Sequence, residues 1–219
     1  MTSSPTVVGA HMSTFTRTIV MALQHLGVAY EWIDAAPHSD TARQYNPFGK
    51  IPSFVTQDGH TIYEALAIRT FIEQKWGNSL SLSGDLAVRV NQWTSVVSDY
   101  VFKDIIFGVC KPRFAMEEKQ IEEGEIKQRL QGPVEKACHI LSVLEGLFSE
   151  TKGPWLCGAE LSWADLYLFP CLADVYSTPE AEAAKRAAPQ IWEWFQHFEK
   201  LDIAQKTYRN TVAYNRAKI

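Results

Sequence analysis

The chain lacks the motifs that hold metals and nucleotides. Its six histidines show no H-E-x-x-H or comparable spacing, and neither G-x-G-x-x-G nor G-x-x-x-x-G-K occurs. Its four cysteines are widely spaced, form no C-x-x-C pair and stand in apolar contexts that are typical of reduced core thiols. The sequence therefore predicts no disulfide, no metal site and no nucleotide-binding loop.

A concentration of positive charge is also missing. The 21 Lys and Arg residues are scattered against 25 Asp and Glu, which gives a formal net charge of -4. A nucleic-acid binder is expected to carry a basic patch or stripe. The start of the chain has neither a basic segment nor an apolar stretch of signal-peptide length, and no later run approaches a membrane span. We therefore expect a cytoplasmic protein that binds neither nucleic acid nor a membrane.

The chain is rich in apolar residues, with 46% hydrophobic and 12% aromatic residues, which is enough for a well-buried core. Its 219 residues can form one large domain or two modest ones. Apolar periodicity and turn residues predict the order β-α-β, loop, β-β-α in the first third. The expected elements are a strand at 6–8, a helix that ends at Gly27, a strand at 30–34, a polar loop at 37–44, a hairpin of 53–56 with 61–63, and a helix to residue 76.

The composition then shifts to Gly, Ser and Asn, which is typical of a linker. Everything beyond it has helical spacing of apolar residues. We expect a first domain at 1–78, a linker at 79–85 and an all-helical domain at 86–219. The helices expected there run along 93–105, 134–148 and 163–172, with a further helix along 191–198 that begins near Pro189.

The stretch 46–52, Asn-Pro-Phe-Gly-Lys-Ile-Pro, and the helix that opens at Glu64 are the most informative features. A strand begins at Pro52, turns at Asp58-Gly59 and leads directly into that helix. Such a connection gathers unpaired backbone groups and a carboxylate around one spot. The spot suits a small zwitterionic peptide.

Three separated motifs can be compared with known families: Ser-Thr-Phe-Thr-Arg at 13–17, the 46–52 stretch, and Leu-Ser-Trp-Ala-Asp-Leu at 161–166. Together they resemble the cytosolic glutathione transferases. The first two are similar to the phi class, and the likeness extends over essentially the whole chain. It implies an α/β thioredoxin-like domain of βαβ-ββα order followed by an all-helical bundle domain. It also implies a homodimer, with Phe48 a candidate key residue at its interface.

For Ser13, the resemblance implies a catalytic role. Glutathione reacts as a thiolate, and a free cysteine thiol titrates at ~8.5, so the enzyme must lower that pKa. At the start of the first helix, the Ser13 hydroxyl can donate to the sulfur while the helix end favours negative charge. The alternative is that Ser13 only caps the helix, and Thr14 can do the same work one residue later.

Further contacts with glutathione, the expected co-substrate, follow from the same resemblance. A cis Ile51–Pro52 bond would let the Ile51 backbone pair with the cysteinyl part of the tripeptide, although most X-Pro bonds are trans. Lys50 is expected at the glycyl carboxylate, unless it is simply solvated. His38 is expected at the same glycyl end.

Glu64 and Ala65 are expected to bind the γ-glutamyl end. The Glu64 carboxylate can accept from the ammonium group, while the Ala65 amide at the helix end receives the carboxylate. Glu64 can alternatively serve only the helix dipole. The family usually has Ser where this chain has Ala65, and losing that hydroxyl would weaken affinity by ~0.5 to 1.5 kcal/mol.

The resemblance leaves the second substrate open. Met12 and Phe15 neighbour Ser13 and are candidates for the pocket of a small hydrophobic electrophile, although aromatic residues at helical spacing are more often core. Ser162 and Asp165 are expected to be reciprocal helix caps and to touch no substrate. The expected function is a glutathione transferase. Its alternatives are glutathione-dependent disulfide reduction or ether cleavage on the same site, and a non-catalytic binding or scaffold protein.

Overall fold

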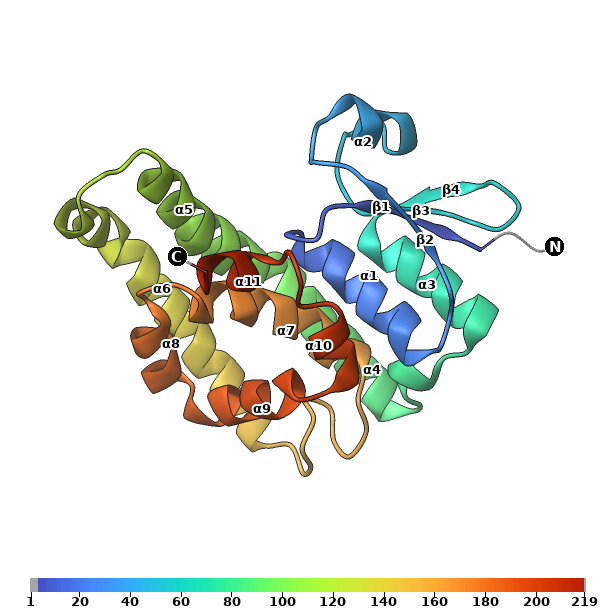
Figure 1. Cartoon of the computed structure of the whole chain (residues 1–219). Coiled ribbons are helices and arrows are strands. Elements are labelled where there is room, and N and C mark those ends of the chain that lie inside the picture. Colours follow the sequence, from blue (N-terminus) through green and yellow to red (C-terminus); the bar gives the residue numbers. More distant parts are fainter. Residues whose placement is uncertain (1–3, 219) are drawn as a thin grey trace. The chain divides into compact units, whose positions relative to one another are not determined.

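The chain folds as two units, seen in a computed structural model that describes residues 4–218 (Figure 1). The first unit contains the residues up to Ser81 together with Leu201–Asn215, and the second contains Leu82–Lys200 with the residues from Arg216 onward. The division after Ser81 lies inside the expected linker, where Ser79–Ser81 form the 3-10 turn η1. The sequence pattern had assigned 201–215 to the helical domain.

A four-stranded mixed sheet of order β2-β1-β3-β4 forms the centre of the first unit. Strand β1 runs parallel to β2 and antiparallel to β3, and β4 completes the β3 hairpin. The strands are β1 (Thr6–Gly9), β2 (Glu31–Asp34), β3 (Ser53–Val55) and β4 (Thr61–Tyr63), and the helices are α1 (Thr14–His25), α2 (Asp40–Tyr45) and α3 (Ala65–Trp76). This order agrees with the predicted βαβ-ββα arrangement, apart from α2.

The two faces of the sheet have separate cores. Val7 pairs with Phe54 in the β1–β3 register, and the Phe54 ring lies 5.8 Å from that of Phe71 on α3. Val8, which points the other way in the strand, clusters with Ala42 of α2. Figure 1 shows α1 and α3 together on one face and α2 on the other. The alternation of buried residues thus fixes which helix covers which face.

Helix α2 corrects one expectation, because its residues had been predicted to form part of a polar loop. Its N-cap is Ser39, whose hydroxyl accepts a hydrogen bond from the Ala42 N–H at 3.1 Å. Only Ala42 is buried among its six residues. So short a helix with one buried position has no apolar periodicity from which it could be recognised.

The second unit is helical. Its elements are α4 (Asp85–Val96), the π-helical η2 (Val97–Cys110), α5 (Lys111–Glu118), α6 (Glu123–Ser149), α7 (Trp163–Tyr176), α8 (Ala181–Ala187) and α9 (Pro189–Glu199). All of α7 from Trp163 to Val175 is buried, and it packs on α4 and η2. The predicted capping box of Ser162 with Asp165 is present at its start.

The segment that returns to the first unit contains α10 (Asp202–Lys206) and leads to α11 (Val212–Arg216). Arg17 of α1 is 6% exposed and holds this segment. Its Nε donates to the Thr207 hydroxyl at 3.2 Å, and its Nη2 donates to the Ala204 carbonyl at 3.1 Å. These long-range bonds explain why 201–215 packs with the first unit, which apolar spacing within the segment could not reveal.

Candidate functional site

Ser13 is positioned by the way α1 packs on the end of β1. Thr16 is fully buried, and a Cβ added at Gly9 would lie 2.5 Å from its hydroxyl oxygen. Only glycine therefore allows the helix to approach the strand this closely. This role of Gly9 could not be predicted from the sequence, since a glycine after a strand commonly marks only a turn.

The Ser13 hydroxyl caps α1. Its oxygen accepts a hydrogen bond from the Thr16 N–H at 3.3 Å, and the Ser13 N–H donates to the Ala10 carbonyl at 3.0 Å. Among the described residues, no acceptor engages the Ser13 hydroxyl proton. Capping and donation therefore use different parts of one hydroxyl and do not exclude each other. Thr14, the alternative, is only 6% exposed.

The loop before β3 is folded against the start of α2. The His38 N–H donates to the Gly49 carbonyl, and the Asn46 carbonyl accepts from the Gly49 N–H at 2.8 Å. Both His38 and Gly49 have positive φ, at 62° and 65°. The structure therefore brings His38 beside the residue that precedes Lys50, and both the His38 and Lys50 side chains are exposed.

The chain then passes through a cis Ile51–Pro52 peptide bond into β3. Pro52 is buried and Ile51 is partly exposed. Within residues 4–218, the backbone N–H and C=O of Ile51 take part in no hydrogen bond. A partly exposed residue with both backbone groups unpaired can bind an extended peptide in the manner of one more strand.

Glu64 lies where β4 runs into α3. It is the N-cap of α3 with φ 69° and ψ 123°, a conformation that is costly for a residue with a Cβ. Its carboxylate makes no capping bond, and the side chain is exposed. Throughout the described chain, no acceptor engages the Ala65 N–H. The helix start thus offers an unpaired amide beside an unpaired carboxylate, which suits a group that carries both charges.

Met12 and Phe15, the candidates for the electrophile pocket, flank Ser13. Met12 is 58% exposed. Phe15 is partly exposed. The other site residues, Ser13, Lys50, Ile51, Glu64 and Ala65, also belong to the first unit.

Comparisons with known proteins agree with these motifs. The sequence model "Glutathione S-transferase, N-terminal domain" matches residues 12–75, and "Glutathione S-transferase, C-terminal domain" matches residues 109–206. Together the two matches include most of the chain. The chain belongs to the cytosolic glutathione S-transferase family. The predicted family is therefore confirmed, and its phi-like character rests on the plant relatives described next.

Two relatives match this transferase over nearly its whole length. "Glutathione S-transferase F6" from Arabidopsis thaliana is 26% identical, over 91% of this chain and 97% of the relative. "Glutathione S-transferase 4" from Zea mays is 28% identical, over 91% and 90%. The crystal structure of glutathione transferase F7 from Populus trichocarpa is 24% identical with a TM-score of 0.78, over 94% and 98%, and shows the shared fold.

Residues 4–218 lack two kinds of feature. No helix there is long and apolar enough to cross a membrane. In the same residues, no group of three or more His, Cys, Asp and Glu side chains is arranged to hold a metal ion. The matches above do not favour the alternatives of a reductase, an ether-cleaving enzyme or a scaffold protein.

Proposed function

We propose that this glutathione transferase binds glutathione along one edge of its first unit and that Ser13 stabilises the bound thiolate. The observation that carries the proposal is the Ser13 hydroxyl. Its oxygen is anchored by the Thr16 N–H, while its proton has no acceptor among the described residues. A thiolate placed there would accept that proton and would also lie at the positive end of α1.

The remaining contacts would follow the length of the tripeptide. Glu64 and the Ala65 amide bind the γ-glutamyl end, and the unpaired backbone of Ile51 pairs with the cysteinyl residue. Lys50 and His38 meet the glycyl carboxylate. Support comes from the hydrogen bond between the His38 N–H and the Gly49 carbonyl, which holds His38 next to Lys50.

The chemistry needs little beyond anion stabilisation and proximity. The thiolate attacks an electrophilic carbon, a carbon–sulfur bond forms, and the leaving group departs with the bonding electrons. Met12 and Phe15 would contact the apolar part of this second substrate. Met12 supports this role because so exposed an apolar side chain gains burial when a hydrophobic molecule binds.

Two measurements test the proposed function. Calorimetry with glutathione should give a dissociation constant between the micromolar and millimolar ranges. Conjugation of 1-chloro-2,4-dinitrobenzene, followed by its product absorbance, should be slowed by about 10² in Ser13→Ala if one anion-stabilising donor is lost. Absence of glutathione binding would contradict the proposal. If glutathione binds and Ser13→Ala keeps full activity, the protein is still a glutathione transferase, but the thiolate contact belongs to Thr14 and not to Ser13.

We further propose that the protein is a homodimer with Phe48 at its interface. The Phe48 side chain is 65% exposed, and its ring meets that of Tyr63 edge-on with the centroids 6.4 Å apart. An exposed aromatic pair of this kind marks a surface for association. Phe48→Ser should shift sedimentation towards the monomer, whereas Val143→Ser, which changes another exposed apolar residue on α6, should not. A dimer that Phe48→Ser leaves intact would contradict this role.

The cytoplasm is the proposed compartment. The four cysteines of the chain are all free in the structure. Free thiols suit a reducing environment. Fractionation of cells that express the protein would test this, and recovery from an oxidising compartment would contradict it.

A further inference from the structure

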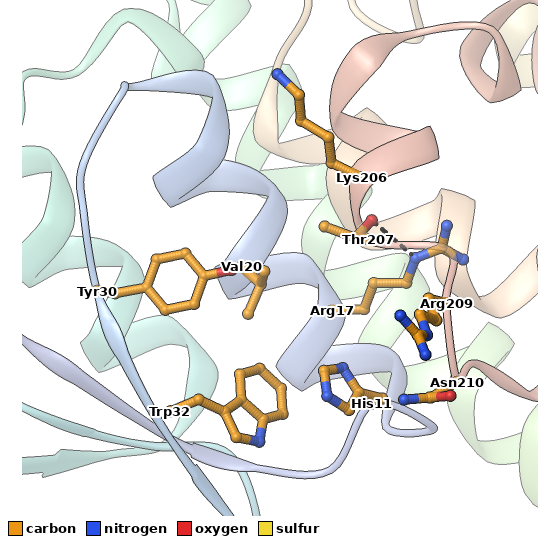
Figure 2. A pocket seen from close by; sticks show the side chains of 9 residues that line it. All are labelled: His11, Arg17, Val20, Tyr30, Trp32, Lys206, Thr207, Arg209 and Asn210. Atoms are coloured by element: carbon orange, nitrogen blue, oxygen red, sulfur yellow. Dashed lines mark hydrogen bonds between the residues drawn. The ribbon is translucent and has the colours of Figure 1, made fainter.

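Arg17 ties helix α1 to the C-terminal part of the chain. Its Nε donates to the Thr207 hydroxyl at 3.2 Å, as Figure 2 shows, and its Nη2 donates to the Ala204 carbonyl at 3.1 Å. Both acceptors lie in Leu201–Asn215, which we call the returning segment and which packs with the first unit. Within this segment, α10 packs on α1, and Ala204 is buried. The returning segment therefore covers part of α1.

The packing that surrounds Ser13 lies on the helix side of this residue. His11 and Met12, in the turn before Ser13, are exposed. Thr14 and Thr16, in the first turn of α1, are buried. The position of the Ser13 hydroxyl is therefore set mainly by how firmly the first turn of α1 is fixed.

Two neighbouring residues of α1 bond directly to Ser13. The Thr16 N–H donates to the Ser13 hydroxyl oxygen at 3.3 Å, and the Arg17 N–H donates to the Ser13 carbonyl at 2.9 Å. Each has its own side-chain anchor, Thr16 against Gly9 of β1 and Arg17 on the returning segment. Ser13 and Arg17 are four positions apart and lie on the same face of the helix. A movement of Arg17 would therefore reach Ser13 through one hydrogen bond.

The Arg17 side chain depends on its acceptors because it is buried. It is only 6% exposed, and a buried charged group that loses a hydrogen-bond partner is costly. Without the Thr207 hydroxyl, the Arg17 Nε would have to turn towards water or a different acceptor. The first turn of α1 would shift or loosen as a result.

We propose that Arg17 and Thr207 are positioning residues for Ser13, so that the returning segment takes part in catalysis without touching the substrate. This inference rests on the proposed role of Ser13. A hydrogen bond weakens steeply as its angle departs from linear, so a small rotation of the first turn would weaken donation to the thiolate. Binding of the tripeptide itself should change little, because Ile51 and Glu64 lie outside α1.

The test compares Thr207→Val with Thr207→Ser. Valine has the shape of threonine but offers Arg17 no acceptor, whereas serine keeps the hydroxyl. In Thr207→Val, the pKa of the bound glutathione thiol should rise by about 0.5 to 1 pH unit, the equivalent of one ordinary hydrogen bond. Conjugation of 1-chloro-2,4-dinitrobenzene should show kcat/KM lowered by about threefold to tenfold. Thr207→Ser should stay near the wild type in both measurements.

Two controls separate positioning from a general loss of packing. S-hexylglutathione has no thiol, so its dissociation constant should be the same for the wild type and Thr207→Val. Thr211→Val is the matched control, because Thr211 is also buried in the returning segment and its hydroxyl bonds to the Tyr208 carbonyl and the Tyr214 N–H. That variant should leave the thiol pKa unchanged. A circular dichroism spectrum of each variant checks folding.

The outcomes distinguish this inference from the proposed function. If Ser13→Ala raises the thiol pKa and Thr207→Val does not, Ser13 keeps its role and the positioning role of Thr207 is wrong. If Ser13→Ala leaves the pKa of the wild type unchanged, the proposed function itself is wrong. An equal rise in Thr211→Val, or weaker binding of S-hexylglutathione to Thr207→Val, would mean a general loss of packing and would also overturn the inference.

Discussion

The Ser13 hydroxyl oxygen accepts a hydrogen bond from the Thr16 N–H at 3.3 Å, and Thr16 is in turn buried against Gly9. The proposed catalytic hydroxyl is therefore also a structural cap, held by the packing of a helix on a strand. Loss of activity in a Ser13 variant does not by itself separate the two roles. The substitution has to be chosen so that one role survives.

Ser13→Asp and Ser13→Ala separate capping from donation. Aspartate caps a helix about as well as serine, whereas alanine costs ~1 kcal/mol of stability. We therefore expect Ser13→Asp to unfold in urea near the wild-type midpoint and Ser13→Ala to unfold earlier. Both should lose conjugation activity, because an aspartate carboxylate has no proton to donate at neutral pH and repels a thiolate. Full activity in the aspartate variant would mean that Ser13 only caps the helix and has no catalytic role.

Ala65→Ser restores the residue that the family usually has at the start of α3. The new hydroxyl can donate to the γ-glutamyl carboxylate beside the unpaired amide. One hydrogen bond is worth ~0.5 to 1.5 kcal/mol, so the dissociation constant for glutathione should fall by about 2- to 13-fold. Calorimetry measures this directly. Ala67→Ser, on the exposed first turn of α3, is the matched control, and equal affinity in all three proteins would exclude Ala65 from the site.

Gly9→Ala tests the packing that positions Ser13. The added Cβ would lie 2.5 Å from Oγ1 and 2.7 Å from Cγ2 of Thr16, a buried β-branched side chain that cannot easily rotate. Overpacking of this kind costs ~1 to 3 kcal/mol. Gly146→Ala is the control, because a Cβ at Gly146 in α6 meets nothing within 4 Å. That variant should match or exceed wild-type stability in urea, and a Gly9→Ala protein as stable as wild type would contradict the packing argument.

Asp165 should make the stability of the protein depend on pH. Its carboxylate accepts hydrogen bonds from Leu156, Ser162 and Trp194, yet burial outweighs them and raises its pKa from 3.8 to about 6. The folded state therefore holds this proton more tightly than the unfolded state. The free energy of unfolding should fall as the pH rises from about 4 to 6, by about 3 kcal/mol from this group alone.

Urea unfolding between pH 4 and 7 measures that contribution. Asp165→Asn cannot titrate, so the difference in unfolding free energy between wild type and this variant should shrink as the pH rises through 6. Asp202→Asn, which changes an exposed carboxylate on α10, should follow the wild-type profile. A difference that grows with pH would mean that the hydrogen bonds outweigh burial.

Most of the fold could be predicted from the sequence, because a long helix or strand with one buried face has apolar residues at a regular spacing. The β1 to α3 order and the long helices α6 and α7 are of this kind. The short helices α2, α8, α10 and α11 have only five to seven residues each and show no such regular spacing. The π-helical winding of η2 was also beyond prediction, since the spacing of its apolar residues fits an α-helix.

The candidate site likewise has some features that the sequence predicts and others that it does not. Ser13 and Glu64 could be placed because helix starts have recognisable residues. The positive φ of Glu64 could not, since nothing in a glutamate favours that conformation. The contact of Arg17 with Thr207 and Ala204 joins segments far apart in the chain, and no local pattern reports such a contact.

The central claim is that the Ser13 hydroxyl lowers the pKa of bound glutathione. The most direct measurement is a pH titration of thiolate absorbance for glutathione bound to wild type, Ser13→Ala and Ser13→Asp. Bound to the wild type, the thiol should titrate well below the ~8.5 of a free cysteine. Loss of one hydrogen bond to a charged group should raise the pKa of the bound thiol by about one to two pH units in Ser13→Ala. In Ser13→Asp the pKa should rise by at least as much. The same low value in all three proteins would contradict the claim.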